Sequence, residues 1–228
     1  MFRKLITALG FGGAAMASAA AGGVQGPYAE AQTNLMYNLM FCDNAALFKP
    51  QTGAHAADWQ AILFADRPDP GAIAGLAADE GQESRVRILA YNWLSANGRP
   101  VPGRRLLGVV VEVPVQGGLD TLAVYPDGRI RYINHSGKMA LFDAVPSEVA
   151  TKIAELMASS QLAVDRLNPW NKPRLPASKE NVRMSFLASD GLYFGEGPFA
   201  AMEREPMAAP ILMRASELLQ FVVKVGVK

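Results

Sequence analysis

The chain lacks most of the residues with which proteins build disulfides and metal centres. Its 228 residues include one cysteine, Cys42, and two histidines, His55 and His135. A single cysteine excludes an intramolecular disulfide, and no H-E-x-x-H or C-x-x-C spacing brings zinc ligands together. The sequence also has no run of acidic residues at alternating positions, which a calcium-binding loop requires. We therefore expect no metal site.

Cys42 follows two apolar residues, Met40 and Phe41. Free cysteine is among the most frequently buried residue types, and a buried thiol is usually inert. A catalytic cysteine would need a histidine beside it, and nothing in the sequence places His55 or His135 there. We expect a buried, unreactive thiol.

The sequence also lacks an excess of charge of either sign. It has 22 lysines and arginines against 21 aspartates and glutamates, which gives a formal net charge of +1. Nucleic-acid binding needs a basic patch that follows the phosphate backbone, and no such cluster occurs, so we expect no nucleic-acid partner. A protein partner or a small ligand remains open, and the sequence does not indicate the oligomeric state.

No stretch is long and apolar enough for a transmembrane helix, but the first residues resemble a secretory signal. The basic pair Arg3-Lys4 precedes an apolar run at residues 5–16, and residues 17–19 match the A-x-A cleavage pattern. We expect cleavage near residues 20–22 and export to the periplasm or the medium. Glycines inside the apolar run favour the alternative, in which residues 1–27 are a flexible arm of a cytoplasmic protein. Neither interpretation includes a stable transmembrane anchor.

Asp-Gly pairs separate short runs of alternating apolar residues. Asp127-Gly128 stands between residues 119–125 and 129–134, and Asp190-Gly191 stands between residues 182–188 and 192–194. Glycine tolerates the positive φ that a tight turn needs, so both patterns predict β-hairpins. The nearly all-apolar run 106–113, which Pro114 ends, predicts a strand buried on both faces. With a short strand at 139–142, these runs predict a four-stranded meander followed by a C-terminal hairpin.

Helical spacing of apolar residues predicts helices on either side of these strands. The predicted helices cover residues 28–42, 58–64, 72–78, 83–96, 147–160, 199–204 and 211–223. Half of the residues are hydrophobic, which is enough for a substantial core. We therefore predict one α+β domain from residue 28 to residue 228, with a helical part (28–98) and a sheet and helix part (104–228). Its mostly antiparallel sheet has one face covered by amphipathic helices, and the face carrying Arg129 and Arg131 is expected to be solvated.

Four polar residues are predicted to lie at one end of the meander: Asp120, His135, Ser136 and Lys138. A serine with a histidine and an aspartate nearby is the constellation of a nucleophilic hydrolase. The alternative is an ordinary polar hairpin turn at residues 134–138, because Asn, Ser and Gly are favoured there for backbone reasons.

Gly195 and Gly197 belong to a G-x-G-x-x-A pattern after a strand, which is typical of dinucleotide-binding loops. The pattern here follows a hairpin, and a dinucleotide site needs a βαβ unit. We therefore interpret residues 195–198 as a glycine-rich loop, with Pro198 starting a helix, and expect no cofactor.

Trp170 lies in a proline-rich connector at residues 168–176. An aromatic residue among prolines and basic residues can mark a binding surface; the alternative is that Trp170 pins the connector to the domain. The sequence thus predicts a non-catalytic binding or accessory protein. The alternatives are a hydrolase acting through residues 134–138 and a self-associating structural protein, which would show an exposed apolar stripe or an unpaired sheet edge.

Overall fold

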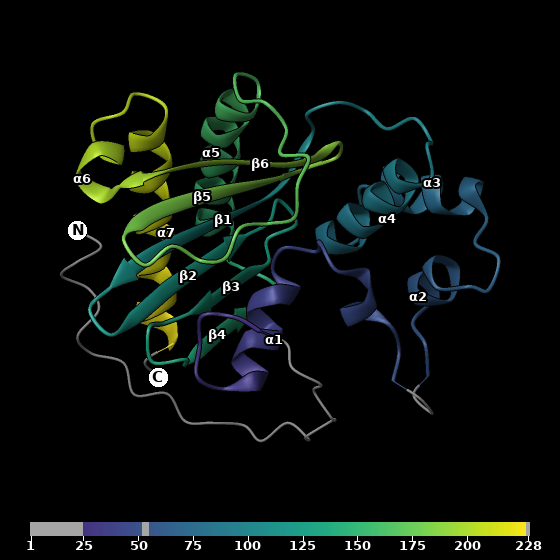
Figure 1. Cartoon of the computed structure of the whole chain (residues 1–228), viewed down its shortest axis with the longest axis horizontal. Coiled ribbons are helices and arrows are strands. Elements are labelled where there is room, and N and C mark those ends of the chain that lie inside the picture. The colour runs from purple at the N-terminus through teal and green to yellow at the C-terminus, as the bar shows by residue number, and fades with distance from the viewer. Residues whose placement is uncertain (1–24, 52–54, 227–228) are drawn as a thin grey trace.

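Six antiparallel strands form one sheet in the order β4-β3-β2-β1-β5-β6 (Figure 1). The computed structural model describes residues 25–51 and 55–226, so the predicted signal segment lies outside the described residues. The strands are β1 (Leu106–Val115), β2 (Gly118–Val124), β3 (Ile130–Ile133), β4 (Met139–Phe142), β5 (Asn181–Ala188) and β6 (Gly191–Pro198). Strands β1 to β4 form a meander, and the β5–β6 hairpin joins it where β5 pairs with β1. The predicted α+β class, meander and C-terminal hairpin are confirmed.

Both predicted Asp-Gly hairpins form. Gly128 has φ +89° and Gly191 has φ +134°, backbone conformations that residues with a side chain rarely adopt. At the first turn the Asp127 carboxylate also accepts the backbone N–H of Arg129 at 3.1 Å. Local chemistry therefore sets the position of each reversal.

Two strands extend further than the sequence predicts, and both do so through a proline. Pro114 lies within β1 and pairs with Leu119 of β2, whereas pairing with β5 ends at Glu112. A proline is tolerated there because the strand has a neighbour on only one side. On edge strand β6, pairing continues to Pro198, so the prediction of a loop at residues 195–198 was wrong.

The helices lie in three groups along the chain. They are α1 (Ala31–Leu39), the 3-10 helix η2 (Ala45–Phe48), α2 (Asp58–Leu63), α3 (Pro70–Ala78), α4 (Ser84–Ala96), α5 (Ser147–Val164), α6 (Phe199–Met202) and α7 (Ala208–Gly226). Helix α3 begins before its apolar run because Asp69 accepts hydrogen bonds from the N–H groups of Gly71 and Ala72, with Pro70 at the first helical position. No helix in residues 25–51 or 55–226 has the length and apolar character needed to span a bilayer.

Helices cover both faces of the sheet, rather than one as predicted (Figure 1). Helices α5 and α7 pack on one face against residues such as Val109 and Phe186, and α1 and α4 pack on the other against Leu107 and Val110. The cause is β1, whose side chains other than Glu112 are apolar on both sides and therefore need cover on both sides. The sheet is the middle of three layers.

Arg131 of β3 faces the layer formed by α1 and α4, and it is only 5% exposed. Its Nη1 donates to the backbone carbonyls of Phe142 and Ile130, at 2.5 and 3.0 Å, and its Nη2 bonds to Asp143. The expectation that this face of the strand is solvated was wrong. The buried guanidinium is tolerated because both of its terminal nitrogens have hydrogen-bond partners.

Candidate functional site

The segment between α5 and β5, residues 168–180, is hereafter the connector. Trp170 ties its first part to the outer edge of β6, where its backbone N–H donates to the carbonyl of Leu192 at 2.7 Å. The indole N–H donates to the carbonyl of Pro173 at 2.9 Å, and the ring packs edge-on against Phe194 with 5.1 Å between centroids. These contacts fit the alternative in which Trp170 holds the connector against the sheet.

Arg174 ties the middle of the connector to the first helices. Its Nε donates to Asp43 Oδ2 at 2.6 Å, its Nη2 to Asn38 Oδ1 at 2.6 Å, and its Nη1 to the Tyr37 hydroxyl at 3.2 Å. The guanidinium lies 3.8 Å from the centroid of the Phe41 ring. Its partners lie more than 130 positions away in the sequence, so no local pattern reveals the contact. With three acceptors and an aromatic face, Arg174 is held in one orientation.

A buried ionic network lies beneath this contact, on the same face of the sheet. The Tyr37 hydroxyl donates to Glu112 Oε1 at 2.7 Å, and Glu112 of β1 is only 1% exposed. Arg183 of β5 approaches the other Glu112 oxygen at 3.9 Å, bonds to Glu196 at 2.7 Å and donates to the carbonyl of Leu175 in the connector at 3.0 Å. The network therefore supports the connector from below.

The carboxyl groups at the two ends of this network have opposite pKa shifts. Burial raises the pKa of Glu112, although the Tyr37 hydrogen bond and the nearby Arg183 offset part of that effect. Burial also tends to raise the pKa of Glu196, but hydrogen bonds from Arg183 and Asn181 hold that pKa below its ordinary value. Arg183 is therefore bound mainly by Glu196, and Glu112 is the member of the network that costs most to ionise.

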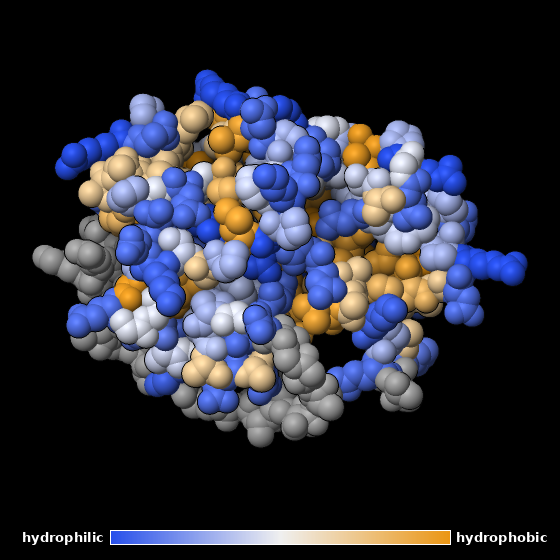
Figure 2. Space-filling model, in the orientation of Figure 1, coloured by the Kyte–Doolittle hydropathy of each residue, from blue (hydrophilic) through white to orange (hydrophobic). Residues whose placement is uncertain are grey.

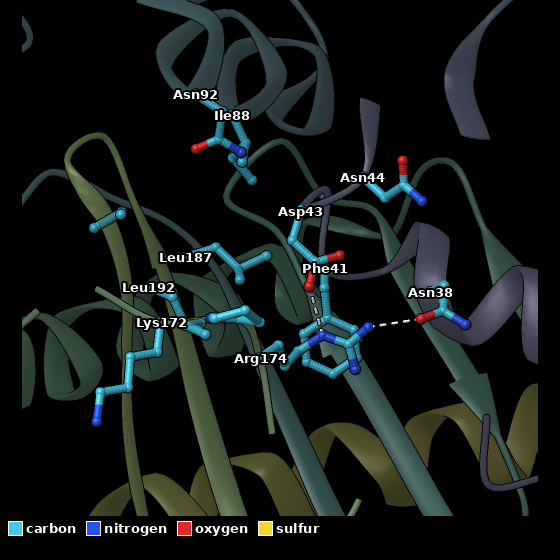
Figure 3. Close-up of a pocket in the computed structure, with 13 residues that line it drawn as sticks. Asn38, Phe41, Asp43, Asn44, Ile88, Asn92, Lys172, Arg174, Leu187 and Leu192 are labelled. Atoms are coloured by element: carbon cyan, nitrogen blue, oxygen red, sulfur yellow. Dashed lines mark hydrogen bonds and ion pairs between the residues drawn. The ribbon is translucent and has the colours of Figure 1, made fainter. Parts of the chain in front are cut away.

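A cleft of about 520 Å³ opens beside Arg174, between the connector, the segment after α1, helix α4 and the β5–β6 hairpin (Figure 3). We call it the connector cleft. Its apolar lining includes Phe41, Ile88, Leu187 and Leu192; its polar lining comprises Asn38, Asp43, Asn44, Asn92, Lys172 and Arg174. Figure 2 shows hydrophobic residues exposed among polar ones between the sheet and helices α2–α4. Small-molecule sites commonly have this volume and this combination of an apolar wall with a few polar groups.

A second cavity, of about 660 Å³, lies on the other side of Arg174. Connector residues 174–179 and the turn between β1 and β2 line it, together with residues 25–27 and helix α1. Among the residues that the structure describes, the linings of the two cavities have Asn38 and Arg174 in common. Arg174 and Asn38, which bond to each other, therefore lie where the two cavities meet.

The structure brings together two of the four predicted hydrolase residues. Asp120 Oδ1 accepts the backbone N–H of His135 at 2.7 Å and lies 3.5 Å from its ring Nδ1. The Ser136 hydroxyl instead donates to Asn134 Oδ1 at 2.8 Å, and the same oxygen accepts the backbone N–H groups of Ser136 and Lys138. Burial raises the pKa of Asp120. Asn134 thus organises the turn, and the cavities described here are not lined by Asp120, His135, Ser136 or Lys138.

Gly195 and Gly197 lie inside β6, where they pair with Met184 and Val182 of β5. A Cβ atom on Gly197 would stand 3.1 Å from the sulfur of Met202, and one on Gly195 would stand 3.9 Å from its methyl group. The strand leads directly into α6, which has only four residues. Gly197 therefore makes room for the Met202 side chain, whereas a Cβ atom at Gly195 would make only an ordinary contact with it.

Cys42 is buried, as predicted, and burial raises the pKa of its thiol. Its backbone carbonyl accepts a hydrogen bond from the amide of Asn92 at 2.9 Å. The residue therefore positions a wall of the connector cleft through its backbone.

No protein-family model matches the chain, and the curated proteins include no sequence similar to it. Its function therefore has to be inferred from the geometry of the site.

Proposed function

We propose that the protein is a non-catalytic binding protein that holds a small ligand in the connector cleft. The observation that carries the proposal is the convergence of charged and amide groups above an apolar wall in a cleft of about 520 Å³. Such a cleft provides apolar surface for affinity, and its polar groups orient and select the ligand.

The polar groups of the cleft are held in place before a ligand arrives. Arg174 is fixed by Asp43, Asn38 and Tyr37, and the Asn92 amide is fixed by the Cys42 carbonyl. Preorganised groups reduce the entropy that binding costs. A guanidinium does not lose its proton in proteins, so the best-held charge in the cleft can bind and orient a ligand but cannot act as a general base.

The test is a ligand screen by native mass spectrometry and thermal shift, with the cleft filled in a variant. Leu192→Trp places a large side chain in the lining, and Leu162→Trp makes the same change on the surface of α5, where Leu162 is 58% exposed. A ligand at a hundred times its Kd should raise Tm by about 5–10 °C. We expect this rise in the wild type and in Leu162→Trp, and its loss in Leu192→Trp.

Two results would contradict the proposal. One is a ligand response that survives in Leu192→Trp unchanged. The other is a screen in which the wild-type protein binds nothing, either as isolated or with added compounds.

A hydrolase is the second candidate, and the contact between Asp120 and His135 supports it. These are the orienting acid and the base of a triad, but the nucleophile would have to be Ser136, whose hydroxyl donates to Asn134. If the protein is a hydrolase, a fluorophosphonate probe labels Ser136, and His135→Ala abolishes the labelling. Absence of labelling in the wild type would remove this candidate.

A further inference from the structure

The connector cleft offers acceptor atoms at one end. Asp43 binds Arg174 through Oδ2, and its Oδ1 accepts no hydrogen bond from any residue that the structure describes. The Asn92 amide donates to Cys42, while its Oδ1 likewise lacks a donor within residues 25–51 and 55–226. A carboxylate oxygen without a donor suits a ligand group with several N–H donors, such as an ammonium.

A lysine, Lys172, lies at the other end of the cleft. Figure 3 shows the Lys172 side chain extending away from the pair formed by Asp43 and Arg174. Its ammonium lies 5.6 Å from the centroid of the Trp170 ring and forms no ion pair with the described part of the chain. An exposed lysine on a cleft wall can bind a ligand carboxylate without first breaking an ion pair.

The wall between these two ends is apolar. Ile88 and Leu187 are buried and Leu192 is half-buried, and all three line the cleft. In Figure 3, Leu187 and Leu192 lie between Lys172 and Asp43. Apolar side chains of a ligand would lose water contact there, which favours binding.

We infer that the connector cleft binds a short apolar peptide of two or three residues with free termini. The N-terminal ammonium binds Asp43 Oδ1, the C-terminal carboxylate binds Lys172, and the side chains contact Ile88, Leu187 and Leu192. An extended chain of this length separates its termini by roughly 7–11 Å. A ligand without a carboxylate would leave Lys172 without an ionic partner, and a ligand without an ammonium would leave Asp43 Oδ1 without a donor, although Arg174 still binds Asp43 Oδ2. The inference rests on the proposed function and specifies the ligand class of the same site.

Titration calorimetry on the full chain tests the ligand class with three peptides: Leu-Leu, N-acetyl-Leu-Leu and Leu-Leu amide. We expect Leu-Leu to bind. N-acetylation should weaken binding about tenfold, because it removes a charge-assisted hydrogen bond. Amidation should weaken it roughly fivefold, because the pair with Lys172 is exposed.

Two matched lysine variants test whether the C-terminal carboxylate of the peptide binds Lys172. Lys172→Ala should weaken Leu-Leu roughly fivefold and leave Leu-Leu amide unchanged. Lys179→Ala is the control, because Lys179 is an exposed lysine of the same connector that lines the other cavity. Both residues are exposed, so neither substitution threatens folding.

Three results would overturn the peptide assignment: no binding of Leu-Leu, binding that neither cap weakens, or equal effects of the two lysine variants. If a ligand without charged ends stabilises the wild type and Leu192→Trp abolishes that effect, the peptide assignment fails and the proposed function stands. If no ligand depends on the cleft, both fail.

Discussion

The two faces of the sheet are built from the same strands but differ in what they bury. Under α5 and α7 the strands present a nearly continuous apolar surface, with Asp120 as the exception at its end. Toward α1, α4 and the connector, the alternate residues include five buried polar or charged side chains: Glu112, Thr121, Arg131, Arg183 and Ser185. Strand alternation assigns each set to its own face.

The two faces therefore have different roles: the apolar face stabilises the fold, and the polar face positions the connector. The apolar face gains its free energy from packing, which needs no particular partner for any atom. The polar face buries ionic groups that add little net stability when paired, and its network fixes where the connector and Arg174 lie. We therefore expect substitutions on the first face to change stability with little effect on binding, and substitutions on the second to change binding more than stability.

The largest loss of stability should come from the apolar face. Leu218 of α7 is fully buried in the core under α5 and α7. Leu218→Ala should lower the free energy of unfolding by about 2–5 kcal/mol, since it leaves a cavity. Denaturant unfolding measures the loss, and calorimetry at a temperature where the variant remains folded should give an unchanged ligand affinity. A weakened affinity would show that the two faces are not independent.

Arg174→Ala should lower the free energy of unfolding less than Leu218→Ala does, and it should weaken ligand binding more. It removes three hydrogen bonds and the stacking on Phe41, a loss of about 1–3 kcal/mol because the side chain is only partly exposed. Arg174→Lys keeps the charge but not the planar fork, so we expect it to restore little of the binding. Full binding by either variant would contradict the role given to the polar face.

The buried carboxyl of Glu112 should make stability depend on pH. Its pKa is raised in the folded protein, so its contribution to stability is fully present below the unfolded-state pKa, near 4.3. That contribution is lost as the pH rises through the folded-state value. Measured by denaturant unfolding between pH 4 and pH 7, the wild type should lose stability relative to Glu112→Gln as the pH rises. Asp120 titrates in both proteins and cancels in the difference. A difference that stays constant with pH would show that the network compensates fully for the burial of Glu112.

Gly197→Ala should have the smallest effect. The added methyl group would meet the sulfur of Met202 at 3.1 Å, and a methionine side chain can shift to accommodate it. We expect a change of less than about 1 kcal/mol in the free energy of unfolding, since β6 is an edge strand and alanine is compatible with its extended backbone. A loss of several kcal/mol would indicate that Gly197 has a role beyond making room for Met202.

The sequence predicts the features of this fold that depend on neighbouring residues. The hairpins at Gly128 and Gly191 follow from turn chemistry, and the strand at residues 139–142 has the predicted bounds. The apolar run 106–113 indicates that both faces of the sheet need cover, but which helices form the second layer, and that Arg131 is buried beneath it, could not be predicted in this way. They depend on which distant segment covers a face, and that information is not contained in local periodicity.

In the candidate site, too, some residues can be singled out from the local sequence and others cannot. Trp170 could be singled out because its connector is unusual in composition. Arg174, Asp43 and Glu112 could not, because their contacts join segments that the fold alone brings together. The charged residue in the central strand, Glu112, was the one available signal of a polar network.

The most direct test of the binding site is hydrogen–deuterium exchange of the full chain with and without the ligand found in the screen. We predict added protection in connector residues 168–180, in residues 41–44 and at the start of β6, and no change in α5 and α7. Protection confined to the turn at residues 134–138, or to the face under α5 and α7, would contradict the assignment of the connector cleft.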